Sequence, residues 1–311
     1  MNMSKTSIKV LYEELRLLTK DTFEAIYRLK KICTNNSTHY ILINDHIGDM
    51  IISLGYLNAF RNSKEKNHIT LVVTEKYKEL VSGYYGDYED VNYIDSHYLY
   101  RIFLLNLTRF GEFYLKKTYP NVTFVNPADS VLLGFDYLKL YPEMNLEKMI
   151  KYGCFGLSNN AKFEPLSDEK YIDIHNKSRS VLLSVESRTV EAGQIELYEK
   201  LVQELEESGF EVYTNIADEE KCFGNSKPFY GSLSEIRKLL YDGVIVGVRS
   251  GLHDLAMYEK CKVVAIYPEN NKFGTLFKLG MLPKISATYF EIYQSENIDN
   301  DCKKIIDFIK K

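Results

Sequence analysis

Three consecutive residues, Arg249-Ser250-Gly251, have the types that bind an anion. They stand in the stretch VIVGVRSGLHDLAMYEKCKVVAIYP (residues 244–268), which reads as an apolar run, a short polar turn, a helix and a second apolar run. The first N–H groups of a helix have no intrahelical acceptor, so such a turn can hold phosphate oxygens. Arg249 offers a guanidinium, Ser250 a hydroxyl, and Gly251 leaves room for a diphosphate.

The residues that follow this turn fit the same interpretation. The backbone amides from Ser250 to Leu252 would face the anion. Asp254 falls on the first turn of the predicted helix, behind His253, where the helix dipole favours a carboxylate and where it could also orient Arg249. The alternative is a capped helix beside an incidental arginine.

A second group of polar residues, NDHIGD (residues 44–49), follows the first predicted strand. Asp45, His46 and Asp49 place three proton-handling groups at one strand end, and Gly48 permits close backbone approach. A catalytic base is therefore one interpretation. The other is that Asp45 or Asp49 caps the helix that begins here.

A third group, SVESRT (residues 184–189), follows the first strand of the second half. Arg188 could donate a bidentate pair of hydrogen bonds to a phosphate, and Ser187 and Thr189 could add hydroxyl contacts; a solvated surface arginine is the alternative. The spaced carboxylates of the chain lie in polar loops, so no metal site is predicted. The GxxxxGK[ST], GxGxxG and GxSxG motifs are absent, which argues against P-loop NTPases, standard dinucleotide dehydrogenases and α/β-hydrolases.

The composition of the chain limits the classes of protein to which it can belong. The chain has 311 residues, 45% of them hydrophobic, and a net charge of −4, so it should fold completely and has no general attraction to nucleic acid. Five cysteines without a CxxC pair predict no disulfide framework and fit a reducing cytosol. No run is apolar enough to be a signal peptide or a membrane span, which predicts a cytoplasmic protein, at most bound to the inner face of the membrane.

The pattern of elements predicts an α/β protein. Residues 5–33 have apolar residues at helical spacing, which indicates an amphipathic helix or helical pair. From residue 39, short apolar runs alternate with helical segments, which predicts parallel sheets of βαβ units. We therefore expect an N-terminal helical extension (1–36) and two Rossmann-like doubly wound domains facing a cleft (37–160 and 161–311), joined near 156–170. The final helix could pack back on the first domain.

The hydrophobic pattern of the sequence gives approximate bounds for each predicted strand and helix. In the first half they are strand 39–44, helix 46–62, strand 68–73, helix 75–85, strand 91–95, helix 100–110 and strand 121–126. In the second half they are strand 180–185, helix 194–209, strand 210–216, helix 232–243, strand 244–248, helix 251–260 and strand 262–268. Ser232 and Glu235 have capping-box spacing at the start of one of these helices.

The glycine–aspartate pair Gly48-Asp49, together with VGVRSGLHDLAMYEKCKVVAIYP, resembles the heptosyltransferase-type glycosyltransferases of bacterial surface-polysaccharide synthesis, which have the GT-B fold. The resemblance spans residues 38–270. It implies that Asp49 is the catalytic base, that Ser250 and Gly251 bind the diphosphate of the donor, and that Arg188 falls near the family's basic residue after the first strand of the donor domain. His253 and Asp254 stand where the family usually has a small residue and then a histidine, and Arg249 stands where it has an acidic residue. This departure resembles the phosphate-binding arginines of GDP-fucose fucosyltransferases, so the donor stays open.

These observations predict a glycosyltransferase that moves a sugar from a nucleotide-diphosphate sugar to a glycan or lipid-linked acceptor, as in lipopolysaccharide synthesis. Asp49 is the first choice as base and His46 the second, with Asp45 and Gly48 on the acceptor side. The donor-binding set is Arg188, Thr189, Arg249, Ser250, Gly251, Leu252 and Asp254.

The same prediction includes an inverting reaction, no metal and no cofactor, and a homodimer or membrane contact through the N-terminal helix. Two alternatives remain open. One is a UDP-sugar 2-epimerase, and the other is a non-catalytic scaffold that binds sugar nucleotides.

Overall fold

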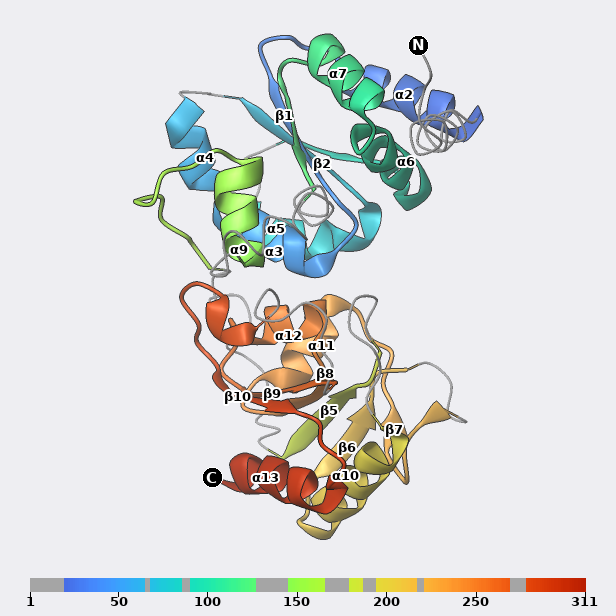
Figure 1. Ribbon diagram of the computed structural model, residues 1–311, viewed down its shortest axis with the longest axis vertical. Helices are drawn as coiled ribbons and strands as arrows, with labels where there is room; N and C mark the ends of the chain where they lie inside the picture. The colour runs from blue at the N-terminus through green and yellow to red at the C-terminus, as the bar shows by residue number, and fades with distance from the viewer. Residues whose placement is uncertain are drawn as a thin grey trace, which may run out of the picture. The chain divides into compact units, whose positions relative to one another are not determined.

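The computed structural model divides into two compact units. It describes residues 20–64, 68–85, 90–126, 145–165, 179–186, 194–216, 221–268 and 278–311. The first unit comprises Met1–Tyr141 with Lys148–Lys162, and the second comprises Pro142–Glu147 with Phe163–Lys311. Figure 1 shows a sheet with helices on both of its faces in each unit.

The first unit is built on a parallel sheet in the order β3-β2-β1-β4. Its strands are β1 (His39–Ile43), β2 (Ile69–Val73), β3 (Asp90–Tyr93) and β4 (Val122–Val125). Apolar runs without alternation suit strands that are covered on both faces. Because the winding reverses between β1 and β4, the carboxyl ends of these two strands form the topological switch point, where doubly wound sheets bind ligands.

Helices cover both faces of the first sheet. On one face lie α2 (Lys20–Ile32), α6 (Ser96–Asn106) and α7 (Arg109–Thr118), and on the other α3 (Ile47–Gly55), α4 (Leu57–Lys64) and α5 (Lys78–Tyr85), which follows the 3-10 turn η1 (Glu75–Tyr77) (Figure 1). The short helix α9 (Leu146–Lys148) leads into a π-helix, η2 (Met149–Cys154), which contacts α3 and β4. The buried side of α2, including Ala25 and Leu29, joins the core formed with α6.

The second unit has a six-stranded parallel sheet in the order β10-β9-β8-β5-β6-β7. Its strands are β5 (Ser180–Ser184), β6 (Glu211–Thr214), β7 (Lys227–Pro228), β8 (Val244–Val248), β9 (Lys262–Tyr267) and β10 (Thr288–Tyr293). This is the strand order of the Rossmann fold, and its switch point lies between β5 and β8.

Two helical layers enclose this second sheet. One consists of α10 (Ile195–Glu207) and α13 (Ile298–Lys310), which pack against each other and bury an aliphatic core over the sheet; the other contains α11 (Leu233–Leu240) and α12 (Gly251–Ala256) (Figure 1). The 3-10 turn η5 (Leu279–Met281) precedes β10. The final helix α13 thus packs on α10 and β10 of its own unit.

The structure confirms the predicted strands to within two residues, and the capping box of Ser232 and Glu235 is present. Two predicted helices are each divided in two, and the helix predicted over 251–260 ends early, at Ala256. Residues 46–62 form α3 and α4, which are separated at Tyr56. The helix expected over 100–110 is divided between α6 and α7, because Thr108 Oγ1 accepts the Gly111 N–H and starts a new helix. Strands β7 and β10 were not predicted. The helix expected over 5–33 is described only from Lys20.

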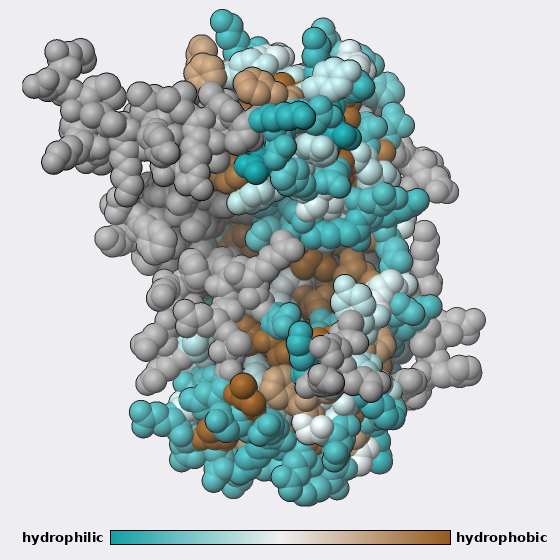
Figure 2. All heavy atoms as spheres, turned by 90° about the vertical axis from the view of Figure 1, so that its right-hand side faces the viewer, coloured by the Kyte–Doolittle hydropathy of each residue, from teal (hydrophilic) through white to brown (hydrophobic). Residues whose placement is uncertain are grey.

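Hydrophilic side chains cover most of the described surface on the face shown in Figure 2. Within the described ranges, every helix is too short or too polar to cross a lipid bilayer.

Candidate functional site

The switch point of the second sheet brings two serines together. Ser184 ends β5 and Ser250 follows β8, and their Oγ atoms lie 3.2 Å apart. The strands can approach here because Gly247 has φ +153°, and a Cβ at this position would lie 2.0 Å from the Ser184 carbonyl oxygen. A glycine is therefore required beside the site.

Arg249 forms a buried ion pair directly behind this turn. Its Nη2 donates to Asp254 Oδ1 at 2.7 Å, and the two residues are only 6% and 0% exposed. Burial raises the pKa of Asp254 to about 6, although the Arg249 charge acts in the opposite direction. The contact expected between Asp254 and Arg249 is present. The guanidinium is thus a fixed charge beneath the turn, rather than an extended surface side chain.

His253 fixes the direction of a hydrogen-bond chain. Burial, followed by the Arg249 charge, lowers the pKa of His253 to about 3, although the hydrogen bond to the Val264 carbonyl opposes this. The ring is therefore neutral. Because a carbonyl can only accept, Nε2 carries the proton and donates to Val264 O at 3.2 Å, which leaves Nδ1 as an acceptor.

The proton positions of the two serines follow from that tautomer. Ser250 Oγ must donate to His253 Nδ1 at 3.2 Å, and Ser184 Oγ must then donate to Ser250 Oγ. The Ser250 hydroxyl proton, predicted to contact a phosphate, is directed at His253 in this structure. The turn therefore has a rigid polar base formed by neutral hydroxyls and a neutral imidazole.

The groups that this turn offers to a ligand are backbone N–H donors. Ser250 is the N-cap of α12, with an extended backbone (φ −143°, ψ 174°), and its carbonyl accepts the N–H groups of His253 and Asp254. The N–H groups of Gly251 and Leu252 come before these first helical bonds, and both residues are half-buried. An anion placed here would meet two amide donors and the positive end of the helix dipole.

The corresponding turn in the first unit is organised around Asp45, which is half-buried. Its Oδ1 accepts from Thr74 Oγ1 at 2.9 Å and lies 2.7 Å from Lys76 Nζ, and its Oδ2 accepts from Ser96 Oγ at 2.5 Å. Burial alone would raise the pKa of Asp45, but the hydrogen bonds from Lys76, Ser96 and Thr74 outweigh it and lower the pKa. Asp45 thus ties together the carboxyl ends of β1, β2 and β3.

The other residues of this turn occupy the start of α3. His46 is the N-cap and is exposed, while Gly48 and Asp49 lie in the first turn and are buried, with Asp49 6% exposed. The N-cap position therefore belongs to His46, so the interpretation that Asp45 or Asp49 caps this helix is wrong. A carboxylate in the first turn is favoured by the helix dipole, and the role of Asp49 as the base stays a prediction.

Most of the predicted site residues fall into two groups, one in each unit. Arg249, Ser250, Gly251, Leu252 and Asp254 lie at the second switch point, and Asp45, His46, Gly48 and Asp49 at the first. Ser187, Arg188 and Thr189 lie outside the described residues. The described residues contain no group of three His, Cys, Asp or Glu side chains placed to hold a metal ion.

Two residues of the second site, Ser184 and Gly247, were not among the candidates predicted from the sequence. The signal for Ser184 was its place at the end of a strand next to the switch point. The signal for Gly247 was a glycine inside an otherwise β-branched strand, which often marks close backbone approach.

Known proteins resemble this chain in fold, whereas searches by sequence find no match. No family model and no curated protein matches the chain. E. coli heptosyltransferase WaaC, solved with ADP-2-deoxy-2-fluoro heptose, has 12% identity and a TM-score of 0.55, with 88% of this chain and 99% of that chain covered. E. coli ADP-heptose lps heptosyltransferase II has 11% identity and a TM-score of 0.53, with 88% and 98% covered.

A third solved structure, the glycosyl transferase family 9 protein from Veillonella parvula, has 13% identity and a TM-score of 0.52, with 89% and 90% covered. At these identities the matches establish the fold. The chain has the two Rossmann-like units of the GT-B heptosyltransferases, as the sequence resemblance implied.

Proposed function

We propose that this protein is a glycosyltransferase that moves a sugar from a nucleotide-diphosphate sugar to a glycan or lipid-linked acceptor. The observation that carries the proposal is the β8–α12 turn, where the N–H groups of Gly251 and Leu252 stand at a switch point above a buried cation. The fold match to WaaC, which was solved with an ADP-sugar, supports the same assignment.

The donor diphosphate would lie on this turn. Its oxygens would accept hydrogen bonds from the N–H groups of Gly251 and Leu252. The buried Arg249 would attract the diphosphate through its charge, without direct contact. Because Arg249 is held by Asp254 and is 6% exposed, we assign it the positioning of the turn and a long-range stabilisation of the departing charge. The network of Ser184, Ser250 and His253 would keep the turn rigid. Arg188 and Thr189 remain proposed donor contacts.

The reaction would need a base for the acceptor hydroxyl, and we assign this role to Asp49, with His46 as the second choice. Asp49 would take the hydroxyl proton as the acceptor oxygen bonds to the anomeric carbon. The bond from that carbon to the phosphate oxygen breaks, and the nucleoside diphosphate leaves with the electron pair. Attack from the opposite face of the sugar would invert the anomeric centre. We propose that no metal is required.

The biological setting belongs to the same proposal. We infer a role in bacterial cell-surface polysaccharide synthesis, such as that of lipopolysaccharide, in the cytoplasm or at the inner face of the membrane. The departure at Arg249 leaves the donor base and sugar to be determined by experiment.

A thermal-shift screen with ADP-, GDP-, UDP- and CMP-linked sugars tests the donor assignment, since a ligand bound only by the folded state raises the melting temperature. One diphosphate-linked class should stabilise the protein. Stabilisation by the CMP-sugars alone, or by no class, would contradict a diphosphate site.

Turnover of the donor identified in this way then tests the base. Asp49→Asn should lower turnover by roughly 10²–10⁴-fold and keep donor affinity, whereas Asp299→Asn, an exposed change on α13, should leave both unchanged. Unaltered turnover in Asp49→Asn would remove Asp49 from the reaction. Conversion of a UDP-sugar without any acceptor would instead favour the epimerase, and donor binding without turnover the scaffold.

A further inference from the structure

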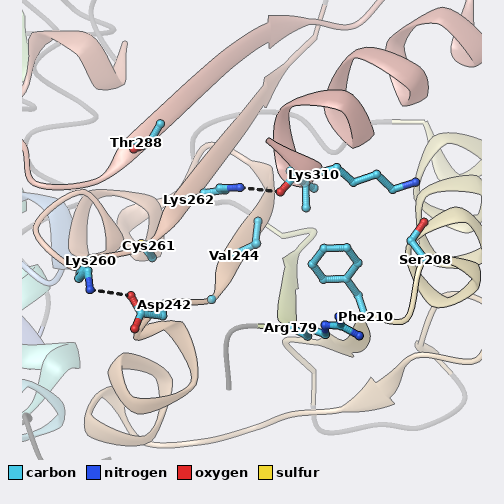
Figure 3. A pocket seen from close by; sticks show the side chains of 12 residues that line it. Arg179, Ser208, Phe210, Asp242, Val244, Lys260, Cys261, Lys262, Thr288 and Lys310 are labelled. Carbon is cyan, nitrogen blue, oxygen red and sulfur yellow. Dashed lines mark hydrogen bonds and ion pairs between the residues drawn. The ribbon is translucent and has the colours of Figure 1, made fainter. Parts of the chain in front are cut away.

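The second unit has a pocket at the edge of its sheet opposite the β8–α12 turn. The pocket has a volume of about 470 Å³ and is formed where β5, β8, β9 and β10 begin and α13 ends (Figure 3). Doubly wound sheets bind their main ligands at the carboxyl ends of the strands, so this pocket is separate from the proposed donor site. The lining residues that matter here are Arg179, Phe210, Asp242, Lys260, Lys262 and Lys310.

Two of its four cationic side chains have partners. Lys262 Nζ donates to the Ile309 carbonyl at 2.6 Å, and Lys260 Nζ lies 3.2 Å from Asp242 Oδ1; both contacts are drawn in Figure 3. The two groups of opposite sign at the pocket, the Asp242 carboxylate and the carbonyl end of α13, are therefore each already matched by a lysine.

The other two cations, Arg179 and Lys310, are available to a ligand. Neither side chain has a hydrogen-bond or ion-pair partner within the described ranges, and both residues are exposed. Figure 3 shows them on the same side of the pocket, with the ring of Phe210 near Arg179. They come from the start of β5 and the end of α13, so the fold, rather than one run of basic sequence, brings them together.

The aromatic wall follows from the way α10 ends. Gly209 has φ +81°, the left-handed conformation that ends helices, and the chain then turns so that the half-buried Phe210 packs on the core. The pocket thus combines a guanidinium, an ammonium and an apolar ring. An arginine binds phosphate oxygens in a forked geometry, and a nearby lysine adds a point charge.

We propose that this pocket is a second anion site, which binds a phosphate group on a molecule that also has an apolar or ring portion to lie against Phe210. A soluble phosphorylated metabolite and the headgroup of an anionic lipid share this chemistry. The inference does not depend on the proposed glycosyl transfer, because it uses none of the residues at the β8–α12 turn.

The absence of tryptophan from the chain permits a direct test. In Phe210→Trp, the single tryptophan reports on this pocket alone. We expect its fluorescence to change on titration with inorganic pyrophosphate or with phosphatidylglycerol vesicles, and not with phosphatidylcholine vesicles. Adding Arg179→Gln and Lys310→Gln should weaken the response to the active probe by roughly tenfold or more, since two charged contacts are lost. The matched control adds Lys303→Gln and Lys304→Gln, two exposed changes on α13.

The outcomes separate the two sources of phosphate. A response to pyrophosphate supports a soluble ligand, and a response to the anionic vesicles alone supports a lipid headgroup. The proposal is overturned if neither probe changes the signal, or if the Lys303 and Lys304 changes weaken binding as much as the Arg179 and Lys310 changes. Should Phe210→Trp fold poorly, pyrophosphate and vesicle titrations of the unlabelled chain, with and without Arg179→Gln and Lys310→Gln, decide the same question.

Discussion

The two switch-point turns of this protein differ in the burial and the partners of their charged residues. After β8, the ion pair of Arg249 and Asp254 is buried, and neutral His253 lies beside it. After β1, Asp45 is held by hydroxyls and by a half-exposed Lys76, while His46 is open to solvent. The turn after β8 has its charged pair buried, whereas the turn after β1 combines the buried Asp49 with the half-buried Asp45 and the exposed His46.

The proposed glycosyl transfer would place different demands on the two turns. A departing diphosphate is stabilised best by donors and charges that do not have to reorganise, which a buried network provides. A base must exchange a proton during each reaction, which requires a group that can change its charge. The predictions below test how far the turn after β8 and the turn after β1 differ.

The largest effect is expected at the buried pair. Asp254→Ala would leave the Arg249 guanidinium buried without its carboxylate, which should lower the free energy of unfolding by about 3–5 kcal/mol. Urea denaturation measures this. The double change Arg249→Met with Asp254→Leu should recover most of the loss, because no charge then remains buried. A loss below about 1 kcal/mol in Asp254→Ala would show that the pair is not desolvated as described.

A smaller effect is expected in the pH dependence of stability. The pKa of His253 is about 3 in the folded protein and near 6.5 when unfolded, so the unfolded state takes up the proton first as the pH falls. The stability gained from neutral His253 is complete above pH 6.5 and is lost as the pH falls toward 3.

Between pH 6.5 and 5, the wild type should lose about 2 kcal/mol more stability than His253→Gln. Urea denaturation at several pH values measures the difference, and His68→Gln, at an exposed histidine before β2, should behave like the wild type. Parallel pH profiles for wild type and His253→Gln would mean that the imidazole is charged or open to water.

The smallest effect is expected in the turn after β1. Asp45→Asn keeps the shape of the side chain and removes its charge, and the partner Lys76 is 44% exposed, so solvent screens the ion pair. We expect a loss of about 1 kcal/mol in the free energy of unfolding, mostly from weaker hydrogen bonds with Thr74 and Ser96. A loss as large as that in Asp254→Ala would remove the contrast between the turns.

The sequence predicted the fold well because its apolar runs are distinct. Parallel strands covered on both faces read as short runs of β-branched residues, as in VIVGV for β8. Strand β10 escaped prediction because its TYFEIY sequence is largely exposed and lies at the sheet edge. The break between α3 and α4 follows Gly55, the last residue of α3, and this glycine was the only local signal for it, since no proline or capping serine stands there.

The site was predicted in position and less well in detail. The sequence pattern of an apolar run, a short polar stretch and a helical segment identified the turn that contains Arg249, Ser250 and Asp254. The burial of Arg249 and the partners of Asp45 depend on residues far away in the sequence, such as Ser96, which no local pattern indicates. The tautomer of His253 depends on the Val264 carbonyl, a contact from helix α12 to strand β9.

The most direct test of the account removes one amide donor from the β8–α12 turn. Gly251 is the first residue of α12, where proline is tolerated, and the extended backbone of Ser250 suits a residue before proline. Gly251→Pro therefore deletes the N–H and keeps the helix, while Gly251→Ala keeps the N–H and serves as the matched control.

Calorimetric titration of both variants with the nucleoside diphosphate of the stabilising donor gives the answer. We predict that Gly251→Pro binds roughly tenfold or more weakly than Gly251→Ala, as expected for a lost hydrogen bond to a charged group. Equal affinity in the two variants would show that the diphosphate does not rest on this turn.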